Sequence, residues 1–389
     1  MDQTRRLILA WQSTNRTLRD RYYLYDRFDT ALSAGAVHGT QAEPIGGVRT
    51  VTDTNSKISI SGGLLSFATG LALNDKVAWP TITRALGIGV VSTINLADVT
   101  SKPNIGWGGG DLYIFNNASN LLYANVNAAA FPVVGTYTAT TYQTAVIYRA
   151  AGMFWFIKGG AFTNWTMMYN SLAGTANRVP QVLTQLATSI FTVDNMRVPK
   201  QAYIPVPLQS DGMSAATTDG LGNPENNGIA GNAYDGVGTP AVAAGVRGFS
   251  ALSGGGLGVS VLACSSHDVN IEVNVTRTAG SAGIIARRAD ASNYIQCLHN
   301  GTNVIVSQVV AGSATTLSTT AVAYSAGATM KFHVEGETYR AFYNNTAAGS
   351  GAVPASTNTN HGIITNDLSG SFDNLVIWAR SGYEGLSLL

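Results

Sequence analysis

The sequence predicts an all-β protein made of two tandem antiparallel β-sandwich domains behind a short N-terminal arm. Charged residues are only 12% of the 389 residues, about half the usual fraction, and Thr, Ser, Asn and Gly take their place. Short runs of Val, Ile, Tyr and Thr, which suit strands, alternate with Gly, Asn and Asp, which suit turns. The length is sufficient for two domains that each bury a core.

Residues 1–25 differ from the rest of the chain because they are basic and aromatic. The segment contains two acids, Asp2 and Asp20. Its arginines and aromatic residues are Arg5, Arg6, Arg16, Arg19, Arg21, Trp11, Tyr22, Tyr23 and Tyr25. This composition favours an arm that docks the chain on a partner or drives oligomerisation. The alternative is a first strand or helix that packs on the first domain, and both interpretations remain open.

The first sandwich is expected to span residues 26–200. Strands are expected, for example, at residues 111–115 and 153–158, and the second of these ends at Gly159-Gly160. Turn residues recur roughly every 8–12 positions, as they do in sandwiches and barrels. A short helix is also expected at residues 180–186.

A linker is expected at residues 201–208 and a second sandwich at residues 209–389. The clearest strand covers residues 268–276, where apolar and polar residues alternate as they do in a strand with one buried face. The apolar positions are Val269, Ile271, Val273 and Val275, and the polar positions are Asn270, Glu272, Asn274 and Thr276.

The two halves of the chain also end alike. Asp194-Asn195 closes the first half and Asp373-Asn374 closes the second, about one domain length later. A repeat at this spacing predicts two copies of one fold and not a solenoid of short units.

Several short motifs are distributed along the second half. They are Thr218-Asp219-Gly220, Pro224-Glu225, residues 268–273, residues 283–287 with Asp290, residues 293–295, residues 299–304, residues 342–345 and residues 372–375. Together they resemble the concanavalin-A-like lectin/laminin-G jelly roll over roughly residues 209–382. The first half carries a looser version in residues 26–28, 156–160 and 164–166. Such domains without a catalytic partner are similar to those of bacteriophage tail, fibre and virion-surface proteins.

The sequence offers no convincing catalytic constellation, and we expect no enzyme activity and no catalytic residue. Glu335 and Glu337 flank Gly336 at a predicted hairpin turn, where solvent would keep both carboxylates from acid/base work. Cys297 and His299 could form only half of a zinc site. We expect no cofactor. Cys264 and Cys297 either pair with each other or remain buried thiols.

Calcium is the one ion that the resemblance implies. Asp219, Asn223 and Glu225 lie within one opening loop, and Ca²⁺ takes six to eight oxygen ligands. The simpler interpretation, which we prefer, is that these residues form ordinary Asx turns.

Candidate glycan-binding residues lie on the polar strand face and in loops. In the second domain they are Asn270, Glu272, Asn274, Arg287, Tyr294 and His333. In the first domain Trp155 is the candidate, with Trp107 and Trp165 also available. Trp155 and Phe154 are adjacent in one strand, so one of them is expected to face outward or towards a neighbour.

We therefore expect a structural or adhesive protein of a bacteriophage virion, in its tail, fibre or surface decoration. The expected partners are other virion proteins through the arm, a second copy of the chain, and a cell-surface glycan. The alternatives are a secreted, extracellular bacterial carbohydrate-binding protein and, third, a polysaccharide-cleaving enzyme. A net charge of +1 argues against nucleic acid, and no apolar stretch is long enough for a membrane span or a signal peptide.

Overall fold

The computed structural model describes residues 18–116, 121–126, 129–149, 152–171, 177–200, 207–211, 235–243 and 246–381, with Tyr383 and Leu386. Nearly all regular structure in these residues is antiparallel strand, and the one short helix covers residues 18–21. The prediction of an all-β fold is confirmed. The part of the chain that is described contains no helix long and apolar enough to cross a membrane.

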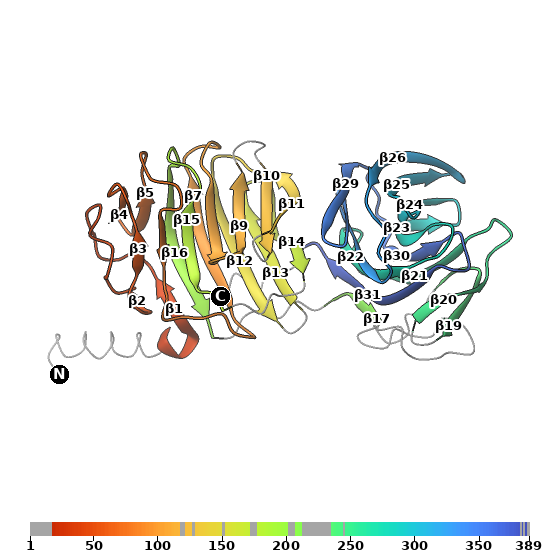
Figure 1. Cartoon of the computed structure of the whole chain (residues 1–389), viewed down its shortest axis with the longest axis horizontal. Helices are drawn as coiled ribbons and strands as arrows, with labels where there is room; N and C mark the ends of the chain where they lie inside the picture. Colours follow the sequence, from red (N-terminus) through yellow and green to blue (C-terminus); the bar gives the residue numbers. More distant parts are fainter. Residues whose placement is uncertain are drawn as a thin grey trace. The chain divides into compact units, whose positions relative to one another are not determined.

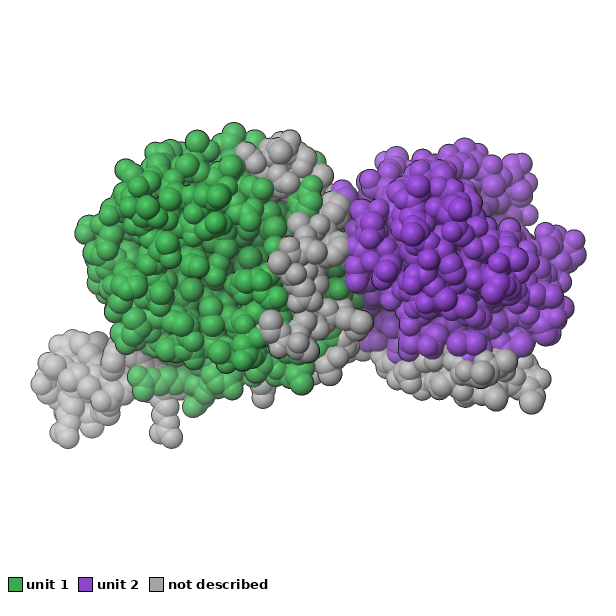
Figure 2. All heavy atoms as spheres, viewed as in Figure 1, with its two compact units in different colours: residues 1–205, 381–389 green, residues 206–380 purple. Residues whose placement is uncertain are grey.

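The chain divides into two compact units (Figure 2). Unit 1 contains Met1–Pro205 together with Ser381–Leu389, and unit 2 contains Val206–Arg380. The last nine residues, which we expected in the second domain, therefore belong to the first unit. Tyr383 lies there with its ring centroid 4.9 Å from that of Phe156, in an edge-on contact.

Unit 1 forms two antiparallel sheets among its described residues (Figure 1). Sheet I contains β1 (Tyr22–Asp26), β2 (Pro44–Ile45), β4 (Ile58–Ser61), β5 (Leu64–Phe67), β7 (Gly89–Leu96), β12 (Thr141–Arg149), β13 (Gly152–Gly159), β14 (Phe162–Ser171) and β16 (Phe191–Pro199). Its order is β14-β13-β12-β7-β16-β1-β2, and β5 pairs with β16 and β4. Sheet II contains β3 (Thr50–Thr52), β6 (Lys76–Ala78), β8 (Pro103–Trp107), β9 (Asp111–Asn116), β10 (Leu121–Val126), β11 (Ala129–Thr136) and β15 (Pro180–Thr184). Its order is β11-β10-β9-β8-β15-β6-β3.

Unit 2 also forms two antiparallel sheets among its described residues. Sheet III contains β17 (Gln209–Asp211), β19 (Thr239–Ala243), β20 (Val246–Ala251), β22 (Val269–Thr276), β27 (Ala328–Glu335), β28 (Thr338–Tyr343), β29 (Thr346–Ala352) and β31 (Ser371–Ala379). Its order is β19-β20-β31-β22-β27-β28-β29, with β17 on β31. Sheet IV contains β18 (Asp235–Val237), β21 (Gly258–Ala263), β23 (Ala282–Asp290), β24 (Asn293–His299), β25 (Asn303–Val310), β26 (Ser313–Ala321) and β30 (Asn360–Thr365). Its order is β18-β21-β30-β23-β24-β25-β26.

The core of unit 2 lies between its two sheets. The apolar side chains of β22, predicted from the alternation, are fully buried there with residues of sheet IV such as Ile284, Val306 and Ile363. On the other face of β22, Glu272, Asn274 and Thr276 are half-buried. The predicted orientation of this strand is confirmed.

The expected helix at residues 180–186 is wrong, because Pro180–Thr184 forms the strand β15. This strand lies between β8 and β6 and is hydrogen-bonded to both. All five of its residues are buried. A strand buried on both faces shows no alternation of apolar and polar residues, so its pattern resembles that of a buried helix.

The end of the predicted arm forms part of sheet I. Tyr22 and Leu24 are buried within β1, and Tyr23 is half-exposed between them. Arg19 and Arg21 lie in the short helix that precedes this strand. The other arm candidates, Arg5, Arg6, Trp11 and Arg16, lie outside the described residues.

The Asp-Asn repeat has a structural counterpart in each unit. The first strand of each unit pairs with its last strand, and a buried aspartate lies opposite the residue that follows the Asp-Asn pair. Asp26 faces Met196 in unit 1, and Asp211 faces Leu375 in unit 2. In both units the last strand also carries a register shift at the Asp-Asn pair. The repeat therefore marks a β-bulge in the last strand of each unit, at Asp194 in unit 1 and at Asn374-Leu375 in unit 2, and such bulges bend a strand at a fixed position.

Candidate functional site

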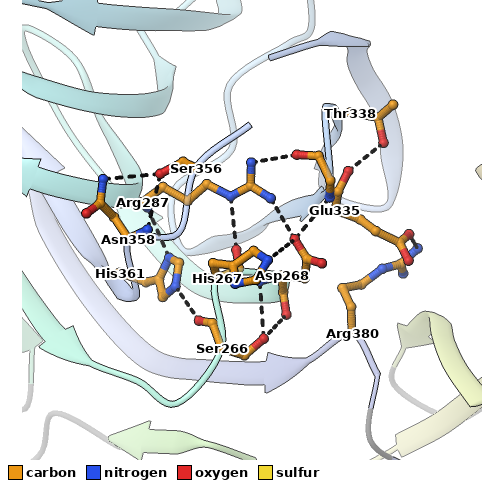
Figure 3. Close-up of polar contacts among 11 residues, drawn as sticks. Ser266, His267, Asp268, Arg287, Glu335, Thr338, Ser356, Asn358, His361 and Arg380 are labelled. Carbon is orange, nitrogen blue, oxygen red and sulfur yellow. Dashed lines mark hydrogen bonds and ion pairs between the residues drawn. The ribbon is translucent and has the colours of Figure 1, made fainter. Parts of the chain in front are cut away.

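Polar side chains of unit 2 gather where several of its loops meet (Figure 3). Arg287, near the end of β23, lies at the centre, and its side chain is 1% exposed. Its Nε donates a hydrogen bond to the carbonyl of His267 at 3.0 Å, and Nη1 donates to the carbonyl of Gly336 at 2.7 Å. Nη2 donates to Oδ1 of Asp268 at 2.7 Å. One guanidinium thus ties the loop before β22 to the turn between β27 and β28.

The backbone of Arg287 is as constrained as its side chain. Its φ of 51° is in the left-handed region, which non-glycine residues rarely occupy. The pairing of β23 with β24 shifts register just after Ala286, so Arg287 lies in a bulge. Its main-chain N–H donates a hydrogen bond to Nδ1 of His361 at 3.1 Å. The bulge turns the side chain away from the strand neighbours and under the loops.

His361 is neutral in this arrangement. Its Nδ1 accepts a hydrogen bond from Arg287, so Nε2 carries the proton and donates to the carbonyl of Ser266 at 3.0 Å. The ring is fully buried, and burial lowers the pKa of His361 to about 4. The hydrogen bond to Ser266 opposes this shift. Burial likewise lowers the pKa of Arg287, against the opposing effect of Asp268.

The carboxylates of this cluster are used to hold loops together. Oδ1 of Asp268 also accepts the main-chain N–H of Gly336 at 3.0 Å. Glu335, one member of the close acid pair seen in the sequence, binds the guanidinium of Arg380 at 2.9 Å. Each acid therefore has a guanidinium partner, and the cluster is a structural staple between loops.

A small groove lies beside this staple. It has a volume of about 170 Å³ and is formed by β24, β25 and the loop at residues 354–358. Pockets for drug-sized ligands are larger, roughly 300–1,000 Å³, so this groove suits a group the size of one sugar ring. Val310, Pro354 and Ala355 provide its exposed apolar surface, and the buried Tyr294 and Ile295 lie beneath it. Two predicted glycan-binding residues, Arg287 and Tyr294, thus meet in one groove.

The polar groups of the groove are mostly amides. Asn293 is already engaged, since its Nδ2 donates to both oxygens of Asp290 at 2.9 Å and its Oδ1 accepts the N–H of Ala311. The half-buried Gln308 has no hydrogen-bond partner for its side-chain amide among the described residues. Asn358 donates to Oγ of Ser356 at 3.1 Å, and its carbonyl oxygen is available. Three N–H groups of the Arg287 guanidinium bind the loops and its side chain is 1% exposed, so the accessible groups of the groove are neutral.

The polar face of β22 is not an open sugar-binding surface. Asn270 is fully buried and its Oδ1 accepts a hydrogen bond from Arg380 at 3.3 Å. Glu272 accepts Nε1–H of Trp378 at 3.0 Å and pairs with Lys331 at 3.3 Å. Asn270 is therefore closed to a glycan, and the partly buried Glu272 is held by its cross-strand partners.

The other two candidates on this sheet lie apart from the groove as well. Oδ1 of Asn274 accepts a hydrogen bond from Thr329 at 2.9 Å. His333 is 1% exposed, with its ring centroid 5.2 Å from that of Phe342, and burial lowers the pKa of His333 well below its usual value. An alternating pattern identifies the polar face of a strand but not whether that face reaches solvent.

Trp155 does not offer a surface for a sugar. It is fully buried and packs edge-on against Tyr169, with ring centroids 5.9 Å apart. Trp107 and Trp165 are equally buried. One of Trp155 and Phe154 was expected to face outward or towards a neighbour. Both side chains are buried and pack against neighbours, because aromatic side chains fill the core of unit 1.

The metal predictions remain without structural support. Asp219, Asn223 and Glu225 lie outside the described residues. Among the residues that are described, no group of three or more His, Cys, Asp or Glu side chains is placed to hold a metal ion. His299 has both ring nitrogens in hydrogen bonds, to Val322 and from Gly301. Cys264 and Cys297 are buried and free, so they do not form a disulfide.

Comparison with known proteins gives structural similarities only. No protein-family model matches the chain, and no curated protein matches it. A carbohydrate-binding module from Bacillus subtilis is 15% identical, with a TM-score of 0.32, and covers 38% of this chain and 95% of its own. A β-1,3-glucanase from Mycobacterium marinum is 12% identical, with a TM-score of 0.32, over 46% of this chain and 98% of its own. A pseudo β-1,3-glucanase of Mycobacterium tuberculosis is 13% identical, with a TM-score of 0.31, over 47% and 99%.

Proposed function

We propose that the chain is a non-enzymatic glycan-binding protein, displayed on a bacteriophage virion, and that the groove of unit 2 takes an uncharged sugar ring. The observation that carries the binding proposal is the composition of the groove. Apolar surface from Val310 and Pro354 flanks the free amide of Gln308 and the carbonyl of Asn358. Apolar walls with a few placed hydrogen-bonding groups are typical of small-molecule sites.

The adjacent cluster supports binding over hydrolysis. Glycoside hydrolysis requires two carboxyl groups across a cleft, one of them as a proton donor. Asp268 and Glu335 are instead bound to Arg287 and Arg380. The virion assignment is supported by the basic, aromatic residues before Leu18 and by the lectin-like motifs of the second half. Genes for tail or capsid proteins beside the gene for this chain would support it, and genes of polysaccharide metabolism alone would contradict it.

The binding proposal is tested with a panel of immobilised neutral and acidic oligosaccharides, followed by calorimetry on the best neutral binder. Replacing Gln308 by Ala should weaken binding about tenfold, because one good hydrogen bond to an uncharged ligand is worth about 1 kcal/mol or somewhat more. Val310→Ser should weaken it by a smaller factor. Thr319→Ala, an exposed change on β26, serves as the matched control. Equal affinity in Gln308→Ala and Thr319→Ala would exclude this groove.

The enzyme alternative has its own assay. Release of reducing ends from a bound polysaccharide, lost on changing a single Asp or Glu, would contradict the proposal. Binding without release of reducing ends over hours supports it.

A further inference from the structure

A second and larger hollow lies in unit 1, and it has no part in the proposed groove. Its volume is about 970 Å³, near the upper end of ligand pockets. Leu18 and Arg19 of the short helix, Tyr23 of β1, and residues 41–47 line it, with Thr81 and Ile82 on the other side. The hollow therefore lies where the N-terminal segment joins the first sheet.

The wall of this hollow is fixed before any ligand arrives. Side chains on Gly46 or Gly47 would overlap Leu24 and Thr81, so the loop packs as closely as its backbone allows. The main-chain N–H of Glu43 donates to the buried carboxylate of Asp26 at 3.3 Å. Both oxygens of Glu43 accept hydrogen bonds from Thr30 at 2.9 Å. A preformed wall lowers the ordering cost of binding.

Arg19 and Arg27 line the hollow, and a third cation, Lys200, lies against the exposed ring of Tyr23, which also lines it. Tyr23 is 50% exposed, and the ammonium of Lys200 lies 5.4 Å from its ring centroid. Arg27 is paired with Asp29 at 2.8 Å. Arg19 and Lys200, by contrast, have no carboxylate partner among the described residues. Arg27 neutralises Asp29, and Glu43 is held by the uncharged groups of Thr30, so Arg19 and Lys200 leave one net positive charge around the hollow to attract an anion.

A peptide strand is poorly suited to this place. The edge of sheet I beside the hollow is β2, which contains only Pro44 and Ile45. Proline has no N–H, and a two-residue edge cannot template an added strand. A rigid ring with polar substituents fits better, because it can lie against Tyr23 and form hydrogen bonds with Gln41 and Thr81.

We propose that the hollow of unit 1 binds an acidic oligosaccharide. A carboxylate of the sugar is held by Arg19 and Lys200, and a sugar ring packs against Tyr23. This inference does not depend on the groove of unit 2. If both hold, one chain carries two sites of different chemistry, one for neutral sugar and one for acidic sugar.

Calorimetry of the full chain with tetragalacturonate tests the proposal. Arg19→Gln and Lys200→Gln should each weaken binding about tenfold, and Tyr23→Ala should weaken it by a similar factor. The affinity of the unchanged protein should fall as salt is raised. Lys102→Gln is the matched control, since this half-buried lysine of unit 1 does not line the hollow and, unlike Lys200, does not lie against Tyr23.

Any of four outcomes would overturn the proposal. Tetragalacturonate could fail to bind at millimolar concentration, a neutral tetrasaccharide of galactose could bind equally well, or Arg19→Gln and Lys200→Gln could have no effect. Tighter binding of tetraglutamate than of tetragalacturonate would assign the hollow to an acidic peptide instead. Gln308→Ala should leave tetragalacturonate binding unchanged, so failure of the unit 2 groove and failure of this hollow are distinguishable.

Discussion

The main-chain N–H of Arg287 donates a hydrogen bond to Nδ1 of His361 at 3.1 Å, and this bond requires the neutral form of the imidazole. A protonated ring would present an N–H to another N–H at this position. His361 therefore stays unprotonated in the folded state of unit 2 at pH values where it binds a proton in the unfolded chain.

Acid should destabilise unit 2 through this histidine. The pKa of His361 is about 4 in the fold and about 6.5 in an unfolded chain. Between these values the unfolded state binds the proton and the folded state does not, so stability falls as pH drops from about 6.5 to about 4. The full effect is about 3 kcal/mol. Urea unfolding at pH 7.5 and pH 4.5 measures it, and His361→Gln should show a smaller loss. Equal losses in both proteins would refute the assignment.

Arg287→Ala should cost about 3 kcal/mol, because it leaves two carbonyls and the Asp268 carboxylate without their buried donor. Chemical denaturation gives the loss, and faster hydrogen exchange at Gly336 should accompany it. Arg27→Ala breaks an ion pair whose side chains are about half exposed, so it should cost less than about 1 kcal/mol. A similar cost for the two changes would mean that Arg287 is not a staple.

The buried carboxylate of Asp26 should be as important for the stability of unit 1 as Arg287 is for the stability of unit 2. Its carboxylate accepts Nε and Nη2 of Arg49 at 2.7 and 2.6 Å and Nε1 of Trp79 at 3.0 Å, and all three side chains are buried. Asp26→Ala and Arg49→Ala should each lower the free energy of unfolding by about 3–5 kcal/mol, since each leaves a buried charge without its partner. The double variant should lose clearly less than the sum of the two losses, as a double-mutant cycle would show. Strict additivity would contradict a coupled pair.

The two cysteines should be inert in the folded protein. Burial raises the pKa of Cys264 to about 12 and raises that of Cys297 further. The thiolate is the reactive form, so a thiol reagent at pH 8 should modify neither cysteine within minutes. Both should react in 6 M guanidinium chloride. Rapid modification of the native protein would show that unit 2 opens locally.

Tyr383→Ala should destabilise unit 1, although this residue follows unit 2 in the sequence. The side chain is 3% exposed and lies against Phe156. Loss of a buried aromatic side chain costs about 3–5 kcal/mol. Thermal unfolding should show a lower midpoint for the transition of unit 1 alone. Leu368→Ala, an exposed change in unit 2, is the control and should leave both transitions in place.

Much of the fold could be predicted from the sequence, because strand alternation and turn chemistry are local. The orientation of β22 follows from its pattern alone. β15 could not be predicted in this way, since it is buried on both faces and its pairing with β6 and β8 joins distant segments. The assignment of the last nine residues to unit 1 also depends on long-range packing.

The candidate site was only partly predictable for a related reason. Arg287 and Tyr294 could be singled out by residue type, but the staple depends on a left-handed residue at a bulge, which no local motif signals. The hollow of unit 1 was missed altogether. Its only sequence signals are Pro44 and Gly46-Gly47, which indicate a tight loop without showing what packs against it.

The assignment of Ser381–Leu389 to unit 1 has a consequence for synthesis on the ribosome. Unit 2 is inserted in the sequence of unit 1, so the main part of unit 1 emerges first and waits for its closing segment. At about 5–20 residues per second, this delay is roughly ten to forty seconds. During that time Phe156 lacks its final cover, and a nascent chain with an uncovered aromatic patch is a natural client for chaperones.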